Sequence, residues 1–192
     1  MQQKELLIFD NYDSFTYNLV HLVEKILHKK VDVVKNDEFD AVSLSGYKKI
    51  IFSPGPGLPA EAGIMKELIF RETGKAAMLG VCLGLQAIAE VFGSRLRNLK
   101  KVNHGLSLPV IYRENCKLFN GISNPFLGGR YHSWVVENDG LPSCFEVIAD
   151  DPGGEIMALQ HKTYNITGVQ FHPESILTPE GEGIMRNWLF HY

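Results

Sequence analysis

The sequence contains little cysteine and no long apolar run. Its three cysteines, Cys82, Cys116 and Cys144, are an odd number with no close pairing motif. This argues against a disulfide framework and favours free thiols in a reducing compartment, the cytoplasm. No stretch approaches the ~18 apolar residues of a membrane helix, and the apolar segment 6–9 is too short for a signal peptide. We therefore expect a cytoplasmic protein without membrane contact.

Long basic runs, metal-ligand spacings and phosphate-binding loops are also missing. The 192 residues carry a formal net charge of −3, and basic residues form only short pairs such as Lys100 and Lys101. Nucleic-acid-binding proteins usually have a basic face, so nucleic acid is not an expected partner. No His and Cys residues have the spacing of a metal site, and Gly-x-Gly-x-x-Gly is absent. We therefore expect no metal and no cofactor.

The first half of the chain alternates between strand and helix patterns. Short apolar runs are typical of buried strands, and apolar residues that recur every three or four positions indicate one face of a helix. Strands buried on both faces and joined by helices indicate a parallel sheet with helices on each side. The expected strands are 6–9, 31–34, 49–52 and 76–81, and the expected helices are 15–27, 62–71 and 83–92.

The second half is richer in strands separated by turn residues. This pattern indicates a small antiparallel extension or side sheet. Because no repeat, low-complexity segment or linker divides the chain, we expect residues 1–192 to form a single α/β domain. The expected strands are 106–112, 129–136, 145–149, 156–161 and 165–171, and a closing helix is expected at 183–191.

Cys82 lies where a strand pattern ends and a helix pattern begins. The sequence GVCLG at 80–84 matches the nucleophile elbow, Gly-x-Ser-x-Gly, with Cys in place of Ser. Side chains at the glycine positions would clash in such a sharp turn. The helix start favours a thiolate, and the backbone N–H of Leu83 could meet an oxyanion. The alternative is a packed cysteine at an ordinary strand-to-helix turn.

A cysteine nucleophile needs a base, and the segment GVQFHPES at 168–175 offers one. His172 follows an apolar strand and precedes a proline. Residues two apart in an extended segment point to the same side, so Glu174 could hold the His172 imidazole in the required tautomer. The alternative is a surface His-Pro turn with a solvated glutamate.

Two further segments carry candidate site residues. SPGPG at 53–57 directly follows an expected strand, and its prolines and glycines could fix the N–H of Gly57 as a second oxyanion donor. A tight connecting turn is the alternative. In RYHSW at 130–134, polar and aromatic side chains could line a pocket. His132 is a rival base to His172, although the spacing favours an ordinary interior histidine.

Together these motifs resemble the triad (class I) glutamine amidotransferases. The closest resemblance is to the glutaminase subunits (component II) of anthranilate synthase and of para-aminobenzoate (aminodeoxychorismate) synthase. The family fold is an open, mostly parallel, flavodoxin-like sheet with helices on both faces, in agreement with the element pattern. The matching segments follow the family order along essentially the whole chain: DNYDSFTYN at 10–18, SPGPG at 53–57, GVCLGLQ at 80–86, RYHS at 130–133 and GVQFHPESILTPEG at 168–181.

The resemblance implies a role for each matching residue. Cys82 would be the nucleophile, His172 the base and Glu174 its orienting acid. The amides of Gly57 and Leu83 would form the oxyanion hole. The residues expected to hold the substrate L-glutamine are Gly55, Pro56, Gly57, Gln86, Ser133 and Trp134, the last two through their backbone.

The chain departs from the family pattern at three positions outside the triad. Leu85 stands where His is frequent, Trp134 where a smaller aliphatic residue is usual, and Leu106 where a lysine is common. We expect these departures to change packing, pocket shape or partner contacts rather than to abolish catalysis.

The resemblance implies hydrolysis of L-glutamine to glutamate and ammonia. The ammonia would be delivered to a separate chorismate-using synthase subunit (component I) in a hetero-oligomer, for tryptophan or folate biosynthesis. A stand-alone γ-glutamyl hydrolase or peptidase on the same fold is the first alternative. A non-catalytic subunit with a decayed site and a flavodoxin-like binder of a nucleotide or flavin are the others.

Overall fold

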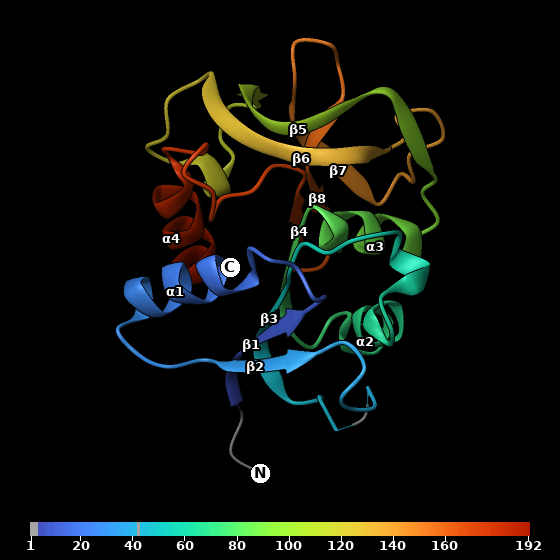
Figure 1. Ribbon diagram of the computed structural model, residues 1–192, viewed down its shortest axis with the longest axis vertical. Coiled ribbons are helices and arrows are strands. Elements are labelled where there is room, and N and C mark those ends of the chain that lie inside the picture. The colour runs from blue at the N-terminus through green and yellow to red at the C-terminus, as the bar shows by residue number, and fades with distance from the viewer. Residues whose placement is uncertain (1–3, 42) are drawn as a thin grey trace.

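The computed structural model describes residues 4–41 and 43–192, and the side chains of these residues except 101–103. Parallel strands form one part of the sheet (Figure 1), in the order β2-β1-β3-β4-β9. Their bounds are β1 Lys4–Asp10, β2 Asp32–Lys35, β3 Tyr47–Phe52, β4 Ala77–Val81 and β9 Ile166–Val169. The expected parallel α/β sheet is confirmed.

Helices cover both faces of this parallel sheet. Figure 1 shows α1 and α4 on one face and α2 and α3 on the other. In α1, the apolar side chains of Leu19, Val23 and Ile26 are buried, as their spacing of three and four predicts. The bounds are α1 Thr16–Leu27, α2 Met65–Glu72, α3 Leu83–Val91 and α4 Gly181–His191, with short 3₁₀ turns η1 Pro59–Glu61 and η2 Lys117–Phe119. Within the described ranges, these helices are too short or too polar to span a lipid bilayer.

Antiparallel strands continue the sheet in the order β9-β8-β7-β5-β6. Strand β7 meets β5 only at Ile111 and Tyr112, whereas β5 and β6 pair over most of their length. The β5–β6 ribbon therefore extends beyond the rest of the sheet, at the top of Figure 1. The bounds are β5 Leu96–Tyr112, β6 Phe126–Val136, β7 Phe145–Asp150 and β8 Ile156–His161.

The sequence misplaced two features of this second half. The last strand, expected in the antiparallel extension, pairs in parallel with β4 on one side and antiparallel with β8 on the other. Every residue of β9 is buried, which suits a strand inside the sheet. Strand β5 begins at Leu96, before the expected start at 106, because the segment 96–105 is mostly polar and lacks the continuous apolar run of a buried strand.

The carboxyl ends of the parallel strands bring the candidate site together. Val81 at the end of β4 lies opposite Val169 at the end of β9, and the N–H of Cys82 donates to the carbonyl of Val169 at 2.8 Å. Segments distant in sequence therefore meet beyond this edge of the sheet, where open α/β sheets bind their ligands.

Candidate active site

Cys82 has a strained backbone between β4 and α3. Its φ of 51° and ψ of −100° lie outside the regions that non-glycine residues usually adopt. A Cβ at Gly80 would lie 2.4 Å from the carbonyl carbon of Gly84, and one at Gly84 would lie 2.4 Å from the carbonyl oxygen of Phe52. Only glycine fits at either position, so the turn is the sharp elbow that the GVCLG motif predicts.

His172 and Glu174 form a buried pair. Nδ1–H of His172 donates to Oε1 of Glu174 at 2.7 Å, and the two side chains are 2% and 0% exposed. This bond places the ring proton on Nδ1 and leaves Nε2 as the free nitrogen. Nε2 is buried, and Cys82 is the other side chain that interacts with His172.

The charge state of His172 is set by opposing effects. Burial alone would lower the pKa of His172, but hydrogen bonding and charge interaction with the Cys82 sulfur and with the Glu174 carboxylate outweigh it and raise this pKa well above its usual value. The imidazolium form is therefore favoured beside the sulfur, as a thiolate–imidazolium pair requires.

A cavity of about 370 Å³ connects the side chains of Cys82 and His172 to the surface. Cys82, His172, Gly55 and Pro56 all line it, so the structure brings these predicted residues together. The remaining lining residues, which the sequence analysis did not single out as site residues, are Tyr12, Asp13, Ser14, Phe15, Pro54, His104 and Tyr131.

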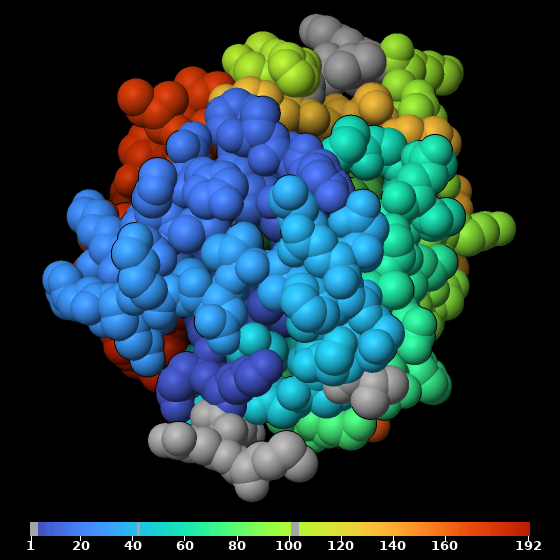
Figure 2. All heavy atoms as spheres, turned by 60° about the horizontal axis from the view of Figure 1, so that its bottom comes forward, coloured from blue at the N-terminus to red at the C-terminus, as the bar shows by residue number. Residues whose placement is uncertain are grey.

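Aromatic side chains from two segments build one wall of this cavity. The ring of Tyr131 lies 5.1 Å from that of Phe15 and 4.9 Å from that of His172, between ring centroids. Its hydroxyl is 3.0 Å from Oγ of Ser175. Figure 2 shows the blue segment that follows β1 next to the gold strand β6, which carries Tyr131. The DNYDS and RYHS motifs therefore meet at the site.

The predicted oxyanion donors lie beside the cavity but do not line it. Leu83 is the first residue of α3, so its N–H has no partner within the helix. Gly57 is exposed, with φ of 72°. A Cβ at Gly55 would lie 2.6 Å from Cδ2 of Leu83, which shows that the SPGPG turn packs directly against the start of α3.

Gln86, Ser133 and Trp134 are placed behind the thiol rather than in the cavity wall. The Gln86 side chain is buried, and its Nε2 donates to the carbonyl of Trp134 at 2.9 Å and to Oε1 of Gln170 at 3.3 Å. Ser133 and Trp134 are half-buried residues of β6. Both N–H groups of the Gln86 carboxamide therefore donate to acceptors within the protein.

Leu85 and His132 are both interior residues. Leu85 is fully buried and packs against Gly168, where a Cβ would lie 2.4 Å from its Cδ1, so this departure from the family pattern changes packing. Nδ1–H of His132 donates to the carbonyl of Trp134 at 3.1 Å. Burial, together with the nearby Arg130 cation, lowers the pKa of His132 to about 4, too low for a base that competes with His172.

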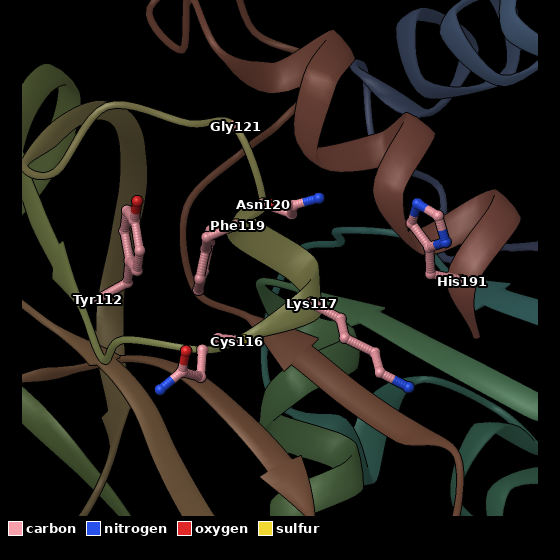
Figure 3. A pocket seen from close by; sticks show the side chains of 8 residues that line it. Tyr112, Cys116, Lys117, Phe119, Asn120, Gly121 and His191 are labelled. Carbon is pink, nitrogen blue, oxygen red and sulfur yellow. The ribbon is translucent and has the colours of Figure 1, made fainter.

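A second cavity of about 470 Å³ lies between η2 and the end of α4 (Figure 3). Cys116 and His191 are among its lining residues. Burial raises the pKa of the Cys116 thiol. The two cavities share no lining residue, so this cavity is separate from the one at Cys82.

The family model described as "Glutamine amidotransferase class-I" matches residues 7–192. The chain belongs to the class-I glutamine amidotransferases. This amidotransferase is 45% identical over 191 residues to anthranilate synthase component 2 of Pseudomonas putida, with 96% of both chains covered. It is 43% identical over 188 residues to aminodeoxychorismate synthase component 2 of Escherichia coli, covering 96% of this chain and 98% of that one.

A solved structure shares the fold of this amidotransferase. A glutamine amidotransferase from Thermotoga maritima superposes with a TM-score of 0.79 at 15% sequence identity, covering 100% of this chain and 98% of that chain. The α/β fold that the sequence predicts is therefore that of a known structure.

Proposed function

We propose that this amidotransferase hydrolyses L-glutamine to glutamate and ammonia with Cys82 as nucleophile, His172 as acid and base, and Glu174 as the group that orients His172. The observation that carries the proposal is that Cys82 and His172 line one cavity, while the Glu174 carboxylate accepts from Nδ1–H of His172. Nucleophile, base and orienting acid thus occupy the relation that a catalytic triad needs.

The reaction proceeds in two halves. The Cys82 thiolate attacks the side-chain amide carbon of glutamine, and the negative charge moves to the amide oxygen. The backbone N–H groups of Leu83 and Gly57 stabilise this oxyanion. His172 gives its proton to the amide nitrogen, ammonia leaves, and a γ-glutamyl thioester remains on Cys82.

Water completes the cycle. His172, now neutral, removes a proton from a water molecule that attacks the thioester carbon. The carbon–sulfur bond breaks, glutamate leaves, and the thiolate and imidazolium are restored. Burial of the triad keeps these charges in a low-dielectric setting, where each interaction is stronger than in water.

The substrate glutamine is held by residues on both sides of the elbow. Gly55, Pro56 and Gly57 present backbone groups from the SPGPG turn, and Ser133 and Trp134 present theirs from β6. Gln86 contributes through Oε1, because both N–H groups of its carboxamide already have acceptors within the protein.

The ammonia is consumed by a second protein. The relatives include component 2 of anthranilate synthase and component 2 of aminodeoxychorismate synthase, at nearly equal identities of 45% and 43%. We propose that residues 1–192 form one glutaminase domain that works in the cytoplasm, within a hetero-oligomer that includes a chorismate-using component I. The similar identities leave the tryptophan and folate branches equally supported.

The test combines this chain with each type of component I, chorismate and amide-¹⁵N glutamine. Label in anthranilate would support the tryptophan branch, label in aminodeoxychorismate the folate branch, and label in both a shared subunit. Glutamate formation that is equally fast without either component I would instead indicate a stand-alone hydrolase. Absence of glutamate in every mixture would overturn the proposal.

A further inference from the structure

Gln170 is a buried polar residue that the proposed mechanism does not use. It follows β9 directly, its side chain is 0% exposed, and its backbone N–H donates to the carbonyl of Met157 at 2.8 Å. Side-chain amides are rarely this buried unless their hydrogen bonds are satisfied. The partners of the Gln170 carboxamide therefore identify what it does.

One of these partners is the sulfur of Cys82. Nε2 of Gln170 donates to Sγ of Cys82 at 3.4 Å. His172, two residues further along the chain, lines the same cavity as Cys82. Both side chains therefore face the elbow, and the sulfur has a neutral amide donor on one side in addition to the imidazole.

The direction of the amide is fixed by a chain of hydrogen bonds. The carbonyl of Trp134 can only accept, so the Gln86 carboxamide must turn its Nε2 toward it. The second N–H of Gln86 donates to Oε1 of Gln170 at 3.3 Å. Reversing the Gln170 amide would place two N–H donors against each other, so its N–H group must face Cys82.

We propose that Gln170 is a positioning residue that holds an N–H donor against the Cys82 sulfur, stabilising the thiolate and fixing the thiol rotamer. A thiolate accepts a hydrogen bond more strongly than a thiol, so a fixed donor favours the ionised form. The inference rests on the proposed role of Cys82 as nucleophile. It also links the sulfur to Trp134 on β6, beside the proposed glutamine-binding backbone.

The test measures alkylation of Cys82 by iodoacetamide as a function of pH, with the Cys82 peptide quantified by mass spectrometry. Gln170→Leu removes the donor at similar size, and Gln170→Glu replaces it with an acceptor. We expect alkylation at pH 7 to fall about tenfold in Gln170→Leu and further in Gln170→Glu, with the midpoint moving to higher pH. Glutamine hydrolysis with component I should lose kcat while KM changes less than about twofold.

Gln160→Leu is the matched control. Gln160 lies on the neighbouring strand β8, and its Oε1 accepts from the Tyr192 hydroxyl at 3.2 Å, away from the elbow. In Gln160→Leu, alkylation of Cys82 should depend on pH as it does in the unsubstituted protein. An unchanged midpoint in both folded Gln170 variants would overturn the inference, and if the Leu variant does not fold, the nearly isosteric Glu variant decides.

Failure of the two proposals can be distinguished, because alkylation needs no glutamine. A shifted midpoint in a protein without glutaminase activity would retain the role of Gln170 and reject the proposed function. An active enzyme whose Gln170 variants show an unshifted alkylation midpoint would retain the proposed function and reject the role of Gln170.

Discussion

The cavity at Cys82 and the cavity at Cys116 each contain a cysteine and a histidine, yet their surroundings differ. Cys82 directly precedes a nine-residue helix, whereas Cys116 precedes a 3₁₀ turn of three residues. His172 is buried and bound to Glu174, whereas His191 is exposed and lines the other cavity (Figure 3). The second cavity is also the larger one. The two cavities therefore share residue types but differ in backbone position and in the orientation of the histidine, which is why we propose a nucleophile only at Cys82.

The largest expected effect separates the two thiols. Cys82→Ser should reduce ammonia release from glutamine, measured with component I present, by at least about a thousandfold, because it removes the proposed nucleophile. Cys116→Ser should remain within about twofold of the unsubstituted protein, because that side chain lies in the separate cavity. Comparable losses in both variants would contradict the assignment of Cys82.

Substituting one glycine near each cavity with alanine tests how tightly the backbone is constrained there. A Cβ at Gly84 would lie 2.4 Å from the carbonyl oxygen of Phe52, whereas one at Gly121 would meet nothing within 4 Å. Gly84→Ala should lower the free energy of unfolding in urea by about 3 kcal/mol through overpacking. Gly121→Ala should lower it by only about 1 kcal/mol, because its φ of 74° strains any residue with a Cβ. Equal losses of unfolding free energy in the two variants would mean that the elbow relaxes to accommodate the added methyl group.

The orienting carboxylate distinguishes the two histidines. Glu174→Gln keeps an acceptor for Nδ1–H but removes the charge that helps to raise the pKa of His172. Because the proposed mechanism needs a protonated His172 to release ammonia, the alkaline limb of the kcat/KM profile should move to lower pH. Activity above neutral pH should fall by about tenfold or more. The corresponding His191→Gln variant should leave the profile unchanged, and a limb that stays in place in Glu174→Gln would refute this role.

The smallest expected effect concerns thiol reactivity in the folded, unsubstituted protein. Burial raises the pKa of Cys116, so its thiolate is scarce at pH 7 and becomes common only in alkali. Iodoacetamide should label Cys82 at least about tenfold faster than Cys116 at pH 7. The ratio of the two labelling rates should decrease at higher pH. Peptide mass spectrometry measures both labelling rates. Equal rates for Cys82 and Cys116 at pH 7 would contradict the prediction.

Local patterns predicted most of the elements and the elbow correctly. The apolar spacing in α1 and the glycines around Cys82 are local constraints, because each depends on neighbours in sequence or on a single tight contact. The prediction that the last strand lies in the antiparallel extension was wrong, because a short buried strand gives no signal for the direction of its partners, and β9 pairs in parallel with β4.

The hydrogen-bond network behind the thiol could not be predicted. The contact between Gln170 and Cys82 depends on strand register, and the direction of its amide depends on a carbonyl of β6 reached through Gln86. A one-dimensional motif identifies Gln170 only as part of GVQFHPES. The roles of Gly57, Leu83, Ser133 and Trp134 in binding remain predictions from the sequence.

The position of β9 also constrains when the site can exist. This strand enters between β4 and β8, and the segment that follows it carries His172 and Glu174. During translation, Cys82 leaves the ribosome long before these residues, with no imidazole beside it. A partly synthesised chain therefore lacks the proposed triad, and the sulfur acquires its partners only when the last strand closes the gap.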